Sequence, residues 1–323
     1  MTRVSFIVFA IASTALLTLR CTRPPSPIDR SMPHQQHRPA ELIVTRVVNG
    51  PIFDLHMKDP EGLAVDDRGI LYLCDAGNNR ILKFGSDLTP LKELGGFGSE
   101  PGMFNLPRFV TIDNRLNIWV TDLGNRRVIR LDSDLKYVDE VRFRDEADPL
   151  KFGTPSGAAA TIYGVLWTAD REKNRIACFD NVGRFDRFIG DFGYSGGQLS
   201  HPEKIIIGSH DEYIVCDPGN RRLIMYDSFG NFTGTLEDPR FESPVSSASD
   251  HDGNLWVLDQ KSARLMLFDR NKGRVLEAGP RLNGDPTPLR EPTDVAVSPD
   301  GRVIIADSGN NRLVICEVIF AAP

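Results

Sequence analysis

Short runs of β-branched, leucine and aromatic residues recur along most of the chain, and each run ends at a cluster of glycine, asparagine and aspartate. In the first such unit, apolar runs occupy residues 62–66, 70–74, 80–84 and 91–94. Runs this short, separated by turn-forming residues, predict β-strands and leave little room for a helix. The pattern therefore predicts a unit of four antiparallel strands.

A proline, an aspartate and an arginine mark six copies of this unit at constant spacing. In every copy the aspartate follows the proline by 15 residues and the arginine follows the aspartate by 5. The triplets are Pro60–Asp75–Arg80, Pro107–Asp122–Arg127, Pro155–Asp170–Arg175, Pro202–Asp217–Arg222, Pro244–Asp259–Arg264 and Pro292–Asp307–Arg312. Successive aspartates are 47, 48, 47, 42 and 48 residues apart. Four-stranded repeats of this length predict propeller blades. We therefore expect an all-β, six-bladed β-propeller of four-stranded antiparallel blades over residues 41–323.

The last unit is one strand short, and a spare strand precedes the first unit. The sixth copy supplies apolar runs at 294–297, 303–306 and 313–319. Residues 41–48 form a further run that has no unit of its own. Pairing this run with the last unit would remove two exposed sheet edges. We therefore expect an N-terminal strand, about residues 42–48, to complete the last blade and close the ring.

The turn between the second and third strands resembles the NHL repeat. The residues that carry the resemblance are 75–81, 122–128, 217–223 and 307–313, which share the order Asp, any residue, Gly, Asn, any residue, Arg and an aliphatic residue. Copy three lacks the glycine, and copy five keeps only the aspartate (Asp259) and the arginine (Arg264). The resemblance covers residues 41–323 and implies a β-propeller. Because the aspartate and arginine recur in every blade, we interpret all twelve as structural residues that hold turn backbone, since Asp bonds turns and Gly supplies positive φ.

The start of the chain has the pattern of an export signal. Met1, Thr2 and Arg3 form a basic start, and the apolar residues 4–19 are too few to span a bilayer comfortably. The stretch that ends at Cys21 is similar to a bacterial lipoprotein signal, although Arg20 stands where a small residue is expected. We therefore expect a signal peptide at 1–20, a proline-rich linker at 21–40, export to the periplasm or cell envelope, and a lipid anchor on Cys21 that attaches the protein to the membrane.

The net charge bears on possible binding partners, and the positions of the cysteines bear on possible disulfide bonds. The net charge is −6 and the chain has no basic run, which disfavours nucleic acid as a partner, although some intracellular NHL proteins are RNA binders through a basic face. The other cysteines take equivalent places in different blades, too far apart for disulfides, and we expect them to be small buried side chains: Cys74, Cys178, Cys216 and Cys316. We expect a monomer.

Two enzyme families with six-bladed propellers offer alternatives. Peptidyl-amidoglycolate lyases, which are similar in repeat style, hold zinc through histidines from several blades, and the six histidines here do not occupy equivalent places. Gluconolactonase-like propellers begin with a Glu-Gly pair that binds a divalent cation, and Glu61-Gly62 resembles that start. Glu203 repeats the position in the fourth copy, so calcium or zinc at Glu61 and Glu203 is the alternative to a protein without a cofactor.

The starts of the innermost strands border the central channel of a propeller. The candidate ligand-binding residues there are Glu61, Arg108, Phe109, Glu203, Lys204 and Asp294, with Thr293 beside them. A mixed acidic and basic rim suits a protein loop or a small polar ligand, and no nucleophile–base pair is recognisable. We predict an exported binding module with no assigned catalytic residue; the alternative is a metal-dependent hydrolase or lyase that uses the channel mouth.

Overall fold

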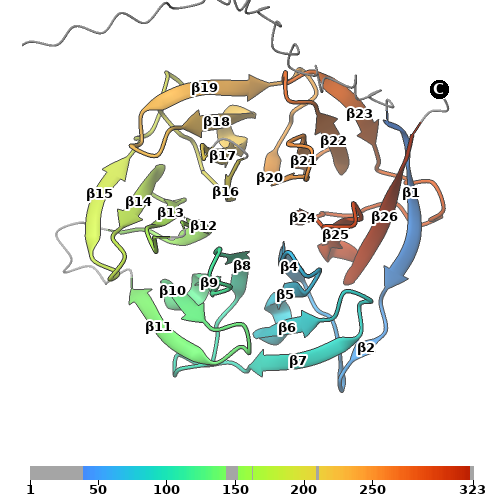
Figure 1. Ribbon diagram of the computed structural model, residues 1–323, viewed down its shortest axis with the longest axis horizontal. Helices are drawn as coiled ribbons and strands as arrows, with labels where there is room; N and C mark the ends of the chain where they lie inside the picture. Colours follow the sequence, from blue (N-terminus) through green and yellow to red (C-terminus); the bar gives the residue numbers. More distant parts are fainter. Residues whose placement is uncertain (1–38, 143–151, 162, 209–210, 321–323) are drawn as a thin grey trace, which may run out of the picture. The chain divides into compact units, whose positions relative to one another are not determined.

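The computed structural model describes residues 39–142, 152–161, 163–208 and 211–320. These residues form six four-stranded antiparallel sheets arranged as the blades of a ring (Figure 1). Innermost strands of neighbouring blades contact one another all the way round, including β24 (Asp294–Val297) of the last blade with β4 (Pro60–Val65) of the first. The predicted all-β six-bladed propeller is confirmed.

Each blade runs from the channel outward in chain order. Blade 1 contains β4, β5 (Leu71–Asp75), β6 (Arg80–Phe84) and β7 (Pro90–Gly95), and blade 2 contains β8 (Pro107–Ile112), β9 (Ile118–Asp122), β10 (Arg127–Leu131) and β11 (Tyr137–Arg142). Blade 3 contains β12 (Pro155–Ala160), β13 (Leu166–Asp170), β14 (Arg175–Phe179) and β15 (Phe185–Ile189), and blade 4 contains β16 (Ile205–Ile207), β17 (Tyr213–Asp217), β18 (Arg222–Tyr226) and β19 (Phe232–Glu237). Blade 5 contains β20 (Pro244–Ser249), β21 (Leu255–Asp259), β22 (Arg264–Phe268) and β23 (Arg274–Ala278).

The ring is closed by the N-terminal strand. In blade 6, β24 and β25 (Val303–Asp307) are followed by β26 (Arg312–Phe320), and β1 (Pro39–Val48) pairs antiparallel with β26 as the outermost strand (Figure 1). The predicted closure is confirmed, and β1 begins three residues before the expected position 42. A small hairpin of β2 (Pro51–Ile52) and β3 (Leu55–His56) then leads into blade 1.

The hydrophobic core is divided among the six blade junctions. Each of six clusters of buried side chains joins two neighbouring sheets; one, for example, joins Leu63 and Leu73 of blade 1 to Ile304 and Leu313 of blade 6. Both faces of every second strand are covered, so all five residues of each are buried, as a sheet packed between two others requires. The four described cysteines are free and buried, in agreement with the sequence prediction.

Short 3₁₀ turns link the second and third strands in four blades: Ala76–Asn78, Leu123–Asn125, Pro218–Asn220 and Ser308–Asn310. These turns lie at the end of the blade where the innermost strand begins, because Asp75 is paired with Pro60 in the ladder, and the same pairing recurs in blades 2, 3 and 5. We call this end of the ring the mouth face. No helix among the residues described here is long and apolar enough to cross a membrane.

Candidate functional site

The repeat arginines and aspartates lie inside the blades on the mouth side. The aspartate and arginine form an ion pair of 2.6 to 3.2 Å in blades 1, 2, 3, 4 and 6. Each aspartate also accepts a backbone N–H from the loop before its blade's proline, for example Lys58 N at 2.7 Å from Asp75 Oδ1. In blade 5, Arg264 pairs with Glu277, while Asp259 holds the N–H groups of neighbouring loop residues. These contacts tie each loop to its sheet.

Two layers of residues lie at or just before the start of the innermost strands, one and two residues after each blade's proline. The first layer is Glu61, Arg108, Ser156, Glu203, Val245 and Thr293, and the second is Gly62, Phe109, Gly157, Lys204, Ser246 and Asp294. The ladder still holds Glu203 and Lys204 before β16 begins, through Glu203 N to Cys216 O and Cys216 N to Lys204 O, each 2.9 Å. The candidate residues predicted from the sequence therefore lie in these two layers.

An outer group of four charged side chains gathers at the mouth. Arg108 Nη2 donates to Glu203 Oε1 at 3.1 Å, and Arg108 Nε lies 3.9 Å from Glu61 Oε2. Arg171 Nε lies 3.1 Å from the same Glu203 oxygen. The group joins blades 1, 2, 3 and 4, and the Glu203 side chain is only 2% exposed. Two guanidinium groups thus converge on one buried carboxylate.

Burial perturbs both carboxylates of the outer group. It raises the pKa of Glu61 to about 7, against the opposing attraction of Arg108, and the negative charge of Glu203 raises it further. Burial also raises the pKa of Glu203, opposed by Arg108 and Arg171. Glu203 Oε2 and the Nε atoms of Arg108 and Arg171 are buried and form no hydrogen bond to the protein groups described. Buried polar atoms without protein partners indicate a place that receives water or a polar ligand.

A second, inner group of side chains, centred on Lys204 and Asp294, is held by hydrogen bonds among its own members and to nearby backbone. Lys204 Nζ donates to Asp294 Oδ1 at 2.6 Å and to Val295 O at 3.1 Å, and Ser246 Oγ donates to the same carboxylate. Leu63 N donates to Asp294 Oδ2 at 2.6 Å. The group ties together blades 1, 4, 5 and 6, and Asp294 is 0% exposed. These contacts make Lys204 and Asp294 bracing groups of the ring in this conformation.

The remaining predicted residues are also engaged with neighbouring blades. Phe109 is buried, and its ring lies 5.6 Å from the Arg108 guanidinium carbon, a cation–π contact. Thr293 Oγ1 donates to Pro60 O at 3.0 Å. Of the candidate residues, Glu61 and Arg108 are therefore the ones that retain exposed side-chain surface, 25% and 20% respectively.

The donor set of the outer group does not fit calcium or zinc. Arg108 lies between the two carboxylates, so a cation there would meet a positive charge and at most two acidic side chains, whereas calcium takes six to eight oxygen ligands and zinc about four donors. Within the described ranges no three His, Cys, Asp or Glu side chains come together as a metal site requires. His201 contacts Ser200 Oγ through Nδ1, and His34, His37 and His210 lie outside the described residues.

Large exposed apolar side chains crowd the loops of the mouth face. Phe53, Leu55, Phe97, Met103, Leu106, Phe192 and Tyr194 are 39–77% exposed on the loops that lead into blades 1, 2 and 4. The loops into blades 2 and 4 have the same backbone arrangement, with an isolated parallel β-bridge between Phe97 and Phe104 in one and between Phe192 and Leu199 in the other. The hairpins of the opposite end expose Tyr163, Val182 and Phe229. Seven of the exposed large apolar side chains of the described residues therefore lie on mouth-face loops, and the others lie on outer strands or at the opposite end.

Sequence reasoning missed Arg171, Ser246 and these loop residues. Arg171 had a signal, because it follows Asp170 where the other copies carry Ala, Leu, Pro, Gln or Ser. The exposed phenylalanines had a weaker one, the matched linkers around Phe97 and Phe192. The predicted signal peptide, most of the linker and Cys21 lie outside the described residues.

Comparison with known proteins agrees with this architecture. The family model of the NHL repeat matches residues 57–84 and 289–316, in blades 1 and 6. The chain is 28% identical to protein brain tumor of Drosophila melanogaster over 128 residues, 39% of this chain and 12% of that protein. It is 31% identical to NHL-repeat-containing protein 4 of Mus musculus over 86 residues, 27% of this chain and 58% of that protein. The matches thus span a minor part of the first relative and about half of the second.

Solved structures share the fold at low identity. A streptogramin B lyase superposes with a TM-score of 0.63 at 15% identity, covering 86% of this chain and 98% of the other. A gluconolactonase of Xanthomonas campestris superposes with a TM-score of 0.61 at 14% identity, covering 87% and 98%. These neighbours share the fold alone, and two segments of the chain match the model of the NHL repeat.

Proposed function

We propose that this protein is an exported binding module that docks a protein partner on its mouth face. The observation that carries the proposal is the concentration of large exposed apolar side chains on the loops of that face, including Phe97 at 77% and Phe192 at 68% exposure. Apolar surface of this kind, rimmed by polar residues, is typical of protein interaction sites. A partner that covers these phenylalanines would remove their apolar surface from water, which favours binding.

The charges of the mouth face favour protein over nucleic acid. Its loops mix acidic and basic residues: Asp54 and Lys58 share the loop into blade 1, and Arg240 and Glu242 share the loop into blade 5. The whole chain carries a net charge of −6. Nucleic-acid binding needs a basic patch that neutralises several phosphates. The ion pairs Arg108–Glu203 and Lys204–Asp294 join different blades across the channel, so a monomeric propeller would hold these loops in fixed positions.

The docking proposal is tested by partner recovery from cell-envelope extracts. We expect the double variant Phe97→Ser/Phe192→Ser to lose most of the proteins that the wild type captures, as measured by quantitative mass spectrometry. Phe229→Ser is the matched control, because Phe229 is also 77% exposed but lies in a hairpin at the other end of blade 4. Equal recovery by all three proteins would refute docking on the mouth face.

We propose the cell envelope as the location and Cys21 as the membrane anchor. Support comes from the signal-like residues 1–20 and the proline-rich stretch that follows, which would hold the propeller away from a membrane. Fractionation of cells that express the full chain tests this. We expect the wild type in the membrane fraction and Cys21→Ser in the soluble exported fraction; an unprocessed wild-type chain in the cytoplasm would overturn the proposal.

A second candidate function is acid–base chemistry on a small polar ligand in the outer group. It is favoured by Glu61, whose pKa of about 7 suits a general acid or base, and by the unpartnered Glu203 Oε2. Because one structural neighbour is a gluconolactonase, a lactone panel is the natural screen. We expect no cofactor. Lactone-cleaving activity in the wild type that is lost in Glu61→Gln would support an enzyme. One bound equivalent of calcium or zinc in protein purified without chelator would favour a metal-dependent hydrolase or lyase.

A further inference from the structure

The same backbone position lies at each junction between blades on the mouth face. The residue that ends the turn between the second and third strands has φ of 52° to 55° in every blade: Asn79, Arg126, Asn174, Arg221, Ala263 and Asn311. A left-handed conformation is unusual for residues other than glycine, with asparagine the best tolerated.

Four of these six side chains tie their blade to the next one. The three asparagines accept a hydrogen bond through Oδ1 from the residue before the next blade's proline: Asn79 from Leu106 N at 2.9 Å, Asn174 from His201 N at 2.8 Å and Asn311 from Asp59 N at 2.8 Å. Arg126 donates instead to Phe152 O at 2.8 Å and Gly153 O at 3.1 Å. We call these contacts the junction ties.

Arg221 forms no junction tie. Its side chain is exposed and makes no hydrogen bond or ion pair with the part of the chain that the structure describes. The N–H of Ser243, before Pro244, is at the position that donates to asparagine in the other ties, but here it donates to Asp259 Oδ2 at 2.7 Å. A guanidinium at this junction is therefore left with all of its N–H donors available.

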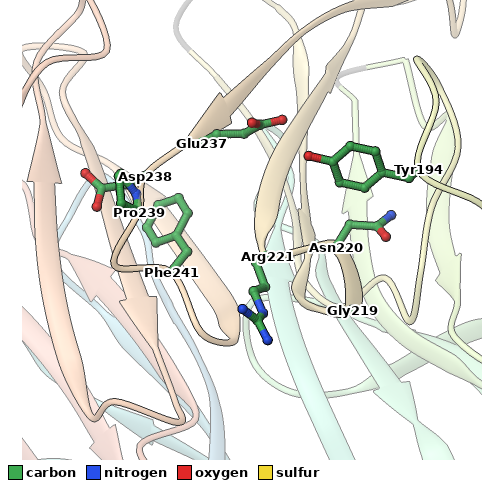
Figure 2. A pocket seen from close by; sticks show the side chains of 8 residues that line it. All are labelled: Tyr194, Gly219, Asn220, Arg221, Glu237, Asp238, Pro239 and Phe241. Carbon is green, nitrogen blue, oxygen red and sulfur yellow. The ribbon is translucent and has the colours of Figure 1, made fainter.

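A cleft opens at this junction. Its volume is about 550 Å³, and it lies between blade 4 and the loop that leads into blade 5 (Figure 2). Its lining residues are Tyr194, Gly219, Asn220, Arg221, Glu237, Asp238, Pro239 and Phe241. In Figure 2, Tyr194 and Asn220 face Pro239 and Phe241 across the opening, with Arg221 between the two walls.

One wall of the cleft is preorganised. The Arg222 guanidinium carbon lies 4.7 Å from the centre of the Tyr194 ring, and Arg222 Nη1 donates to Tyr194 O at 2.8 Å. The buried Arg222, held by Asp217, therefore fixes Tyr194, although Tyr194 is 61% exposed. A fixed aromatic ring offers contact area at a low cost in conformational entropy.

The charged residues that line the cleft indicate which kind of ligand it could bind. Asp238 is neutralised by Arg274 at 3.3 Å. The other acidic lining residue is Glu237, whose carboxylate lies at the opposite end of the opening from the Arg221 guanidinium in Figure 2. We propose that the cleft is a peptide subsite in which Arg221 binds a carboxylate of an extended segment and Tyr194 packs against the neighbouring residue. A guanidinium binds a planar carboxylate through paired hydrogen bonds. This inference rests on the proposed function, because the segment belongs to the protein that docks on the mouth face.

Binding of a positional-scanning library of acetylated heptapeptides to the purified full chain tests the subsite. Amidated and free-acid versions of the library distinguish a side-chain carboxylate from a C-terminal one. We expect enrichment of Asp or Glu in the amidated library, or of free acids over amides, and a roughly 10- to 100-fold loss of that enrichment in Arg221→Gln. Arg126→Gln is the matched control, since Arg126 has the same backbone conformation but is engaged in a junction tie.

Three outcomes would overturn the subsite. They are the absence of acidic or free-acid enrichment in the wild type, equal enrichment in Arg221→Gln, and Arg221-dependent binding of a fluorescent single-stranded oligonucleotide with none of the peptides. The Phe97→Ser/Phe192→Ser variant separates the two proposals. If that variant loses the captured partner while Arg221→Gln binds it normally, the mouth face remains the docking surface and only the subsite is wrong.

Discussion

Neutralising Glu61 is expected to remove a pH dependence from the stability of the propeller. Glu61 lies at the start of β4, with Oε2 3.9 Å from Arg108 Nε and a side chain that is 25% exposed. Burial raises the pKa of its carboxyl from 4.5 to about 7 in the folded protein, so folding holds a proton that the unfolded chain releases. The proposed change is Glu61→Gln, which keeps the shape and is neutral at every pH.

The sign and the size follow from linkage. Because the folded pKa lies above the unfolded one, the stabilising contribution of the protonated carboxyl is complete below pH 4.5 and is lost as the pH rises through about 7. A shift from 4.5 to about 7, at 1.36 kcal/mol for each unit, corresponds to on the order of 3 kcal/mol. Glu61→Gln should therefore exceed the wild type by about 1 kcal/mol or less near pH 5 and by about the full amount near pH 8.

Urea denaturation of both proteins across about pH 5 to 8 measures this difference directly. Glu317→Gln serves as the control for replacing a carboxylate on a strand, because Glu317 is exposed on β26. A stability difference between Glu61→Gln and the wild type that is constant with pH would refute the reasoning. So would a wild type that gains stability relative to the variant as the pH rises.

Two further changes test the ring itself. Lys204→Met should lower the free energy of unfolding by about 3–5 kcal/mol, because it leaves the buried Asp294 carboxylate without its cation. The double variant Lys204→Met/Asp294→Asn should recover part of this loss in the same urea assay. An unchanged urea midpoint for Lys204→Met would contradict the bracing role. Gly157→Ala should cost about 1–3 kcal/mol, since a Cβ would lie 2.3 Å from Glu203 O, whereas Gly50→Ala, with no atom within 4 Å, should be nearly neutral in thermal unfolding. Equal melting temperatures for the two alanine variants would show that the innermost strands can move apart.

Much of the fold was predictable because its signals are local and repeated. The alternation of short apolar runs with turn formers acts within one unit of about 45 residues, and the constant Pro–Asp–Arg spacing sets the copies in phase. Ring closure was predictable as well, since residues 41–48 and the incomplete sixth unit each left an unpaired edge that only the other could cover.

The contacts inside the channel could be predicted only as a set of candidates. The sequence placed Glu61, Arg108, Glu203, Lys204 and Asp294 near the mouth, because each follows a blade's proline by one or two residues. It could not pair them. Arg108 meets Glu203 across 95 positions and Lys204 meets Asp294 across 90, and such pairings depend on the size and closure of the ring.

The sequence by itself determined the blade count, the order of the strands and the place of each turn, because backbone propensity and hydrophobic period act over a few residues. Tertiary structure decided which charges neutralise one another and which remain free. Asn79 and Arg221 have the same backbone conformation at φ 53° and 54°, yet one holds the next blade and the other stands beside a cleft. The difference arises from the loop that each side chain meets, and that loop is brought there by the ring rather than by neighbouring sequence.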